Sequence, residues 1–278
     1  MADKLEVFKG FEISYPEYEI ITPQTLNKFT VRSMTVADEE VLKGSFISPR
    51  SVPTHINKII WTCLAKKPST IKTYDDFLNK VTVLDRDALL YGLYHVTYKD
   101  MQNFDVPCAG ENCENKYPVV LDISKAFSMQ AYKGKPEEIL SKIVKINLKI
   151  VKNTAVEIFQ PTLKSEEQFI TDALFQSQEN MTVGSEMLPV AKFIQYVPNT
   201  DKSISIIERD NIFLGYKSLP AVDRKLINKK YMEEFGNCRV KLQMISICPK
   251  CKHRNESAID ILQNLFRVLY EWENIRTL

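Results

Sequence analysis

Apolar residues recur with helical spacing through much of the first hundred positions. Between Ser51 and Pro68 they fall at i, i+3, i+4, i+7 and i+8, which predicts a core helix with one buried stripe. A broader apolar face predicts a second helix from about Thr82 to Tyr98. The first stripe consists of Ile56, Ile59, Ile60, Cys63 and Leu64.

Two threonines mark expected helix starts. Thr35 and Thr82 each stand three residues before an aspartate, which is the spacing of a capping box. The stretch Tyr74–Leu78 is expected to form only a turn. Residues 1–30 show no helical period, so we expect an extended arm with one strand there.

Alternation of apolar and polar residues begins further along the chain. From Val144 to Ile150 every second residue is apolar, and Val156 and Ile158 continue after a turn at Asn153, which predicts a hairpin. Further strands are expected at 117–123 and 239–244, and further helices at 165–178, 218–236 and 256–276. The last helix has an apolar face broad enough for burial on more than one side, in its own core or against a partner.

Two cysteine pairs supply the strongest chemical signal. Cys108 and Cys113, like Cys248 and Cys251, follow an apolar stretch and enclose turn-forming residues, which is the form of a zinc knuckle. Together the pairs provide the four thiolates of a closed tetrahedral site, which would hold structure and leave no open position for chemistry. We therefore predict a structural zinc site, with iron as the alternative metal.

Other interpretations of the cysteines remain open. The pairs could be redox-active or ordinary buried thiols, and Cys-Pro-Lys-Cys resembles a thioredoxin-type motif, although a Lys-His-Arg-Asn turn stands where a helix should begin. His253 could compete as a ligand, but an exposed or supporting role fits it better. Cys63 and Cys238 are expected to be packing residues.

Composition narrows the function classes. The 278 residues carry a net charge of +2, with 26% charged residues of both signs interspersed, so no basic stripe favours nucleic acid. The first residues lack the features of a signal peptide and no stretch is long enough to span a membrane, so we expect a cytosolic protein with reduced cysteines. No motif for nucleophilic, metallohydrolase, dinucleotide or phosphate chemistry occurs, and we expect no enzyme.

The expected fold class is α+β and mainly helical, with small antiparallel sheets or hairpins and a zinc-ribbon-like site of four cysteines that joins two distant knuckles. The expected domains are an amino-terminal arm (1–30), a helical region (31–105), a zinc-knuckle region with the carboxy-terminal helix (106–125 and 238–278), and an inserted α+β region (126–237).

Several of these features together resemble a known family. A Thr-Val-Ala-Asp-Glu-Glu helix start at Thr35, the isoleucine-rich helix, Asp85-Arg-Asp-Ala-Leu-Leu-Tyr-Gly-Leu-Tyr, and the Cys108 knuckle feeding a Val-Val-Leu-Asp-Ile strand are similar to the baseplate hub proteins of T-even-type bacteriophages. Ala155-Val-Glu-Ile-Phe-Gln-Pro-Thr-Leu extends the resemblance. The metal pairs are its most specific part, and residues 180–240 show no match.

The resemblance implies a non-enzymatic role in phage tail morphogenesis. It suggests a chaperone that binds subunits of the baseplate hub in the host cytoplasm and takes no small-molecule substrate. Trp61, Phe266 and Trp272 are the expected interface anchors, with core burial as the alternative. A permanent structural subunit of the virion baseplate is a second possibility, and a zinc-ribbon protein that binds nucleic acid through Lys250, Lys252, His253 and Arg254 is a third.

Overall fold

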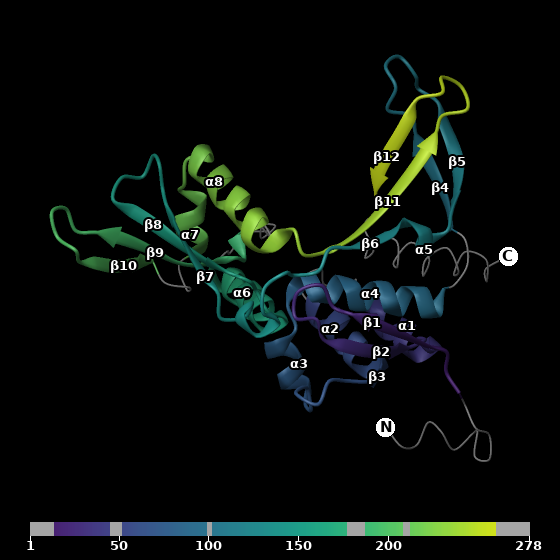
Figure 1. Cartoon of the computed structure of the whole chain (residues 1–278), viewed down its shortest axis with the longest axis horizontal. Helices are drawn as coiled ribbons and strands as arrows, with labels where there is room; N and C mark the ends of the chain where they lie inside the picture. Colours follow the sequence, from purple (N-terminus) through teal and green to yellow (C-terminus); the bar gives the residue numbers. More distant parts are fainter. Residues whose placement is uncertain (1–13, 45–51, 99–101, 177–186, 208–211, 260–278) are drawn as a thin grey trace.

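The computed structural model describes residues 14–44, 52–98, 102–176, 187–207 and 212–259. Figure 1 shows a helical body from which two β-rich parts extend in different directions. One carries a four-stranded sheet and the other a pair of hairpins. Among the described helices, none has the length and apolar character that a membrane span requires.

The body combines a small antiparallel sheet with four helices around one buried core that includes Phe29, Ile60 and Leu89. The sheet has the order β1-β2-β3. Its strands are β1 (Glu17–Ile21), β2 (Lys28–Arg32) and β3 (Leu64–Lys66), and the helices are α1 (Val36–Gly44), α2 (Val52–Cys63), α3 (Tyr74–Lys80) and α4 (Val83–Thr97).

Most of the local expectations for the body are confirmed. The Thr35 and Asp38 side chains bind each other's backbone N–H groups at the start of α1, and the predicted stripe of α2 is buried. Two expectations were wrong, one about where a helix ends and one about the type of an element. The helix after Ser51 ends at Cys63, because the chain enters β3 and pairs with β2, and Tyr74–Leu78 lies in α3, which has its own capping box from Thr73 and Asp76.

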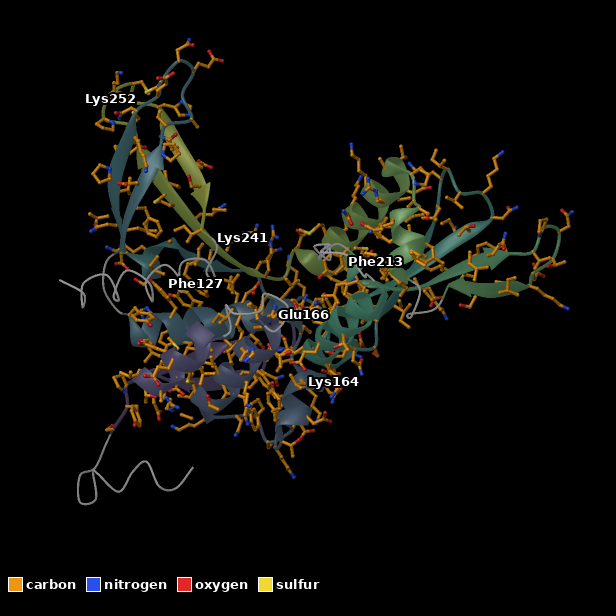
Figure 2. All side chains as sticks on the ribbon, turned by 180° about the vertical axis from the view of Figure 1, so that it is seen from behind. Phe127, Lys164, Glu166, Phe213, Lys241 and Lys252 are labelled. Carbon is orange, nitrogen blue, oxygen red and sulfur yellow. The ribbon has the colours of Figure 1, made fainter. Side chains whose placement is uncertain are left out.

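The second part is an antiparallel sheet of order β10-β9-β8-β7. The predicted hairpin is confirmed as β7 and β8, with Ile146 opposite Val156. Arg86 of α4 forms an ion pair with Glu166 of α6, which links this part to the body. Figure 2 shows Glu166 at this junction. Its elements are β7 (Ile143–Asn147), β8 (Thr154–Phe159), β9 (Val190–Tyr196), β10 (Ser203–Ile207), α6 (Leu163–Gln176), α7 (Ile212–Lys217), α8 (Ala221–Tyr231), the 3-10 turn η4 (Pro136–Glu138) and the π-helical turn η7 (Met232–Gly236).

The third part holds both cysteine pairs. One hairpin pairs β4 with β5, and a separate sheet has the order β12-β11-β6. The bounds are β4 (Gln102–Pro107), β5 (Lys116–Leu121), α5 (Ile123–Ala126), β6 (Phe127–Met129), β11 (Val240–Ile247) and β12 (Arg254–Ala258).

The expectation of a mainly helical protein was wrong. Of the residues that the structure describes, 38% are helical and 30% lie in strands, which form four small antiparallel sheets. Several strands are short or polar, so they lack the alternation by which a strand is recognised in sequence. The helix expected from Glu256 is one such error, since Glu256 lies in β12 opposite Ile245. Ser257 and Ala258 also lie in β12, and from residue 260 onward the expected helix, with Phe266 and Trp272, lies outside the described residues.

Candidate metal centre

The two cysteine pairs occupy the tips of two hairpins that extend together from the body (Figure 1). Cys108 and Cys113 lie in the loop between β4 and β5, and Cys248 and Cys251 lie in the loop between β11 and β12. Each loop is closed by backbone hydrogen bonds, from Cys108 to Asn115 and from Cys248 to His253. Residues more than 130 positions apart therefore meet in one place.

All four sulfur atoms lie within 4.8 Å of one another. The Sγ atoms of Cys108 and Cys251 are 3.4 Å apart, and those of Cys113 and Cys248 are 3.9 Å apart. Four thiolates at about 2.3 Å from a tetrahedral metal would be roughly 3.8 Å from each other. The cysteines are free thiols, and their arrangement can hold a metal ion.

Backbone and side-chain donors are directed at the sulfur atoms. The Gly110 amide lies 3.4 Å from the Cys108 Sγ, and the Asn115 side chain lies 3.5 Å from the Cys248 Sγ. Burial works to raise the pKa of Cys248, but the Cys251 amide, the Asn115 side chain and the Lys250 amide outweigh it and lower the pKa to about 6. Burial is the main factor that raises the pKa of Cys108. The lowered pKa of Cys248 makes a thiolate ligand available near neutral pH.

The two loops fit closely against each other. A Cβ atom at Gly110 would lie 3.0 Å from the His253 Cβ and 3.2 Å from the Cys251 Sγ, so a larger residue there would have to displace one of these side chains where the loops meet. Asn112 and Lys252 adopt φ values of 57° and 65°, the left-handed conformation that turns each loop back on itself.

A buried polar network lies beneath the cysteines. The Asn255 side chain accepts a hydrogen bond from the Ala109 amide at 2.7 Å and donates one to the Tyr117 hydroxyl at 2.6 Å. Tyr117 in turn contacts the Ser246 hydroxyl at 3.0 Å. Because Asn255 belongs to β12 and Ala109 to the other loop, this network joins the two hairpins. Sequence reasoning missed it, since nothing in the polar stretch Arg254–Ala258 marks Asn255 as buried.

The remaining candidate residues lie elsewhere. His253 is exposed and does not belong to the four-residue cluster. Cys63 is buried in the body, where burial raises its pKa to about 12. Trp61 is partly buried against Tyr74 and Phe77, with the Lys67 ammonium 4.0 Å from the centre of its ring.

Comparison with known proteins places the chain in a phage family. Residues 15–267 match the family model described as T4 bacteriophage base plate protein, which confirms the resemblance seen in the sequence. The match includes both cysteine pairs and all three parts of the fold. No curated protein and no solved structure matches the chain. The chain therefore belongs to the family of T4 bacteriophage base plate proteins.

Proposed function

We propose that this base plate protein is a non-enzymatic chaperone for assembly of the central hub. It would bind hub subunits in the host cytoplasm, cover their unassembled surfaces and leave before the particle is complete. The observation that supports partner binding is the exposure of isoleucines on strands of both extended parts, including Ile143, Ile204 and Ile247. Apolar side chains in such positions gain free energy when a partner removes them from water.

The same exposed residues would also suit a permanent subunit, so the stage of assembly is the deciding observation. Quantitative mass spectrometry of infected-cell lysate and of purified phage measures the copy number of the chain in each. A chaperone would be present in the lysate and absent from the finished particle. A fixed copy number in the particle would instead identify a structural component.

We also propose that the four cysteines bind one zinc ion. Thiolates are soft ligands that suit zinc, and four of them fill its coordination sphere, so the ion would fix the two hairpins and perform no chemistry. Elemental analysis of protein purified without added metal should find one zinc per chain. Iron in place of zinc would give a chain with visible absorption and would contradict this assignment.

Nucleic-acid binding is a second candidate, supported by the exposed Lys250, Lys252 and Arg254 at the tip of one hairpin. Salt-sensitive binding of DNA or RNA would support it, and no binding at low salt would exclude it.

A further inference from the structure

The β11–β12 hairpin has an exposed face, here called the outer face, on which β11 carries two isoleucines. Successive residues of β11 alternate between its two faces, with Leu242 and Met244 buried and Ile245 and Ile247 directed outward. The two isoleucines are 56% and 64% exposed. Both lie on one side of one strand, two residues apart, so they form a continuous apolar strip.

One edge of the same strand lacks a strand partner for most of its length. β12 pairs with β11 from Gln243 to Ile247, whereas β6 pairs only with Val240–Leu242. In the part of the chain that the structure describes, no strand continues beside β11 beyond β6. An extended segment could therefore bind beside the apolar strip and use free backbone groups of β11.

The β11–β12 hairpin has an excess of positive charge, although Arg254 and Glu256, which lie opposite the two isoleucines, form an ion pair with each other. Residues 239–256 contain five lysines and arginines and a single acidic residue, Glu256. Figure 2 shows Lys241 near the base of the hairpin and Lys252 at its tip, so positive charge is present at both ends of the strip. The neighbouring β4–β5 hairpin, residues 102–121, has three acidic residues and one lysine. The positive charge is therefore a property of the β11–β12 hairpin and not of the whole part.

We infer that the outer face of β11 docks an extended, acidic segment of another base plate protein, with alternate apolar residues placed against Ile245 and Ile247. This inference rests on the proposed function and names the surface it would use. A protein segment fits better than nucleic acid, because single strands bind to aromatic platforms, whereas this strip consists of isoleucines. Glutamate or aspartate side chains in the segment would complement Lys241 and Lys252 at the two ends of the strip.

The test uses the full-length chain and a short synthetic peptide in which glutamates alternate with isoleucines and valines. Binding is followed by fluorescence anisotropy of the labelled peptide and by shifts of the Ile245 and Ile247 amide resonances. A second peptide has lysines in place of the glutamates, and a DNA duplex is included as a further probe. The Ile245→Ser/Ile247→Ser variant removes the strip, and Val120→Ser, 59% exposed on β5, is the matched control.

We expect the acidic peptide to bind, the lysine peptide to bind at least tenfold more weakly, and added salt to weaken the acidic complex. The double variant should lose about tenfold or more in affinity while Val120→Ser binds like wild type. Equal binding by the double variant, preferential binding of DNA, or self-association of the chain through this face would each overturn the inference. The mass spectrometry of lysate and purified phage does not depend on any of these results. It would therefore still identify a chaperone that binds its partner through another surface.

Discussion

Two buried aspartates, in different parts of the molecule, each accept hydrogen bonds from the backbone of a loop. Asp85, near the start of α4, accepts hydrogen bonds from the backbone amides of Gln24 and Thr25 and from the Thr25 hydroxyl. Asp223, near the start of α8, accepts bonds from the amides of Lys149, Ile150 and Val151. In each case a carboxylate from a helix binds the amides of a loop between two strands. These bonds replace the water that the amides would otherwise contact.

Substitution of Asp85 tests this role. Asp85→Asn keeps the shape of the side chain but replaces one acceptor oxygen with a donor that faces other donors. We expect a loss of about 3 kcal/mol in the free energy of unfolding, because several hydrogen bonds to a buried carboxyl group are disturbed. Urea denaturation measures it. Asp105→Asn is the control, since Asp105 is exposed and its pair with Lys116 should contribute under about 1 kcal/mol. Similar losses in both variants would contradict the assigned role of Asp85.

Asp38 should give a pH-dependent contribution to stability. Burial works to raise its pKa, but the Arg32 guanidinium and the Thr35 amide and hydroxyl outweigh it, so the pKa lies below its usual value. An acid with a lowered folded-state pKa stabilises the protein above its unfolded pKa, and that stability is lost as the pH falls through the folded pKa. Asp38→Asn should therefore cost about 1–2 kcal/mol near pH 7.

The cost of Asp38→Asn should shrink as denaturation is repeated at successively lower pH, below about 4. Glu19→Gln is a suitable control, because Glu19 is exposed beside Lys28. A cost that stays constant over the whole pH range would show that Asp38 acts through its shape and not through its charge.

Thr35 and Thr82 show how far the spacing of residues in the sequence can predict individual hydrogen bonds. Both threonines accept a hydrogen bond from the amide three positions on, as the spacing predicts. The Asp38 carboxylate also binds back to the Thr35 amide, whereas the Asp85 carboxylate turns to Gln24 and Thr25. A partner some 60 residues away cannot be inferred from a local pattern, so only half of the second capping box could be foreseen.

At the scale of elements, the errors have a common physical origin. α2 has one apolar stripe and α4 is apolar around most of its circumference. Both were predicted because their apolar residues recur at helical spacing within the segment itself. β12 has the sequence Arg-Asn-Glu-Ser-Ala and becomes a strand only because β11 supplies its hydrogen bonds. α3 was taken for a turn because it is only seven residues long, although Thr73 and Asp76 begin it with a complete capping box. Short elements depend on tertiary contacts more than on their own sequence.

The contact between the two hairpins can be tested through Asn255. Asn255→Ala removes the side chain that joins β12 to the Cys108 loop and leaves the Ala109 amide and the Tyr117 hydroxyl without this partner. We expect a loss of about 1–3 kcal/mol in stability and a roughly 10- to 100-fold weaker metal affinity. Competition with a chromogenic chelator measures the affinity. Gln243→Ala, on the exposed face of β11, is the control, and equal affinity in both variants would refute the role of Asn255.

At the scale of the whole molecule, the cysteine cluster connects regions that the sequence keeps far apart. Cys108 follows the body, whereas Cys248 follows the four-stranded sheet and α8. We propose that residues 126–237 are an insertion between the two halves of this centre, as the cysteine spacing suggested, with β6 near its start pairing back onto β11. The loop-closure cost of so long a segment grows only with the logarithm of its length, so the insertion is thermodynamically tolerable.

Loss of the metal should loosen one part of the protein and leave another intact. Cys251→Ser should release the proposed zinc ion and expose the β4–β5 and β11–β12 hairpins to proteases, while the body, whose buried cluster includes only Leu242 from these hairpins, stays folded. Limited proteolysis with mass spectrometry locates the cuts. Cys238→Ser is the control, because Cys238 lies outside the cluster. Wild type that keeps its protease resistance and stability in a strong chelator would contradict a structural metal.

The separation of Cys108 and Cys251 in the chain also determines the order in which the two cysteine pairs become available during translation. The first pair of thiols leaves the ribosome well before the second, because Cys251 follows Cys108 by 143 positions, which take roughly 7–30 s to make at typical translation rates. During that interval the β4–β5 hairpin has half a set of ligands and no second hairpin beside it. With the proposed metal bound, the completed centre reports that translation has passed Cys251, and the docking face that we infer on β11 would be held in place only on chains that have reached that point.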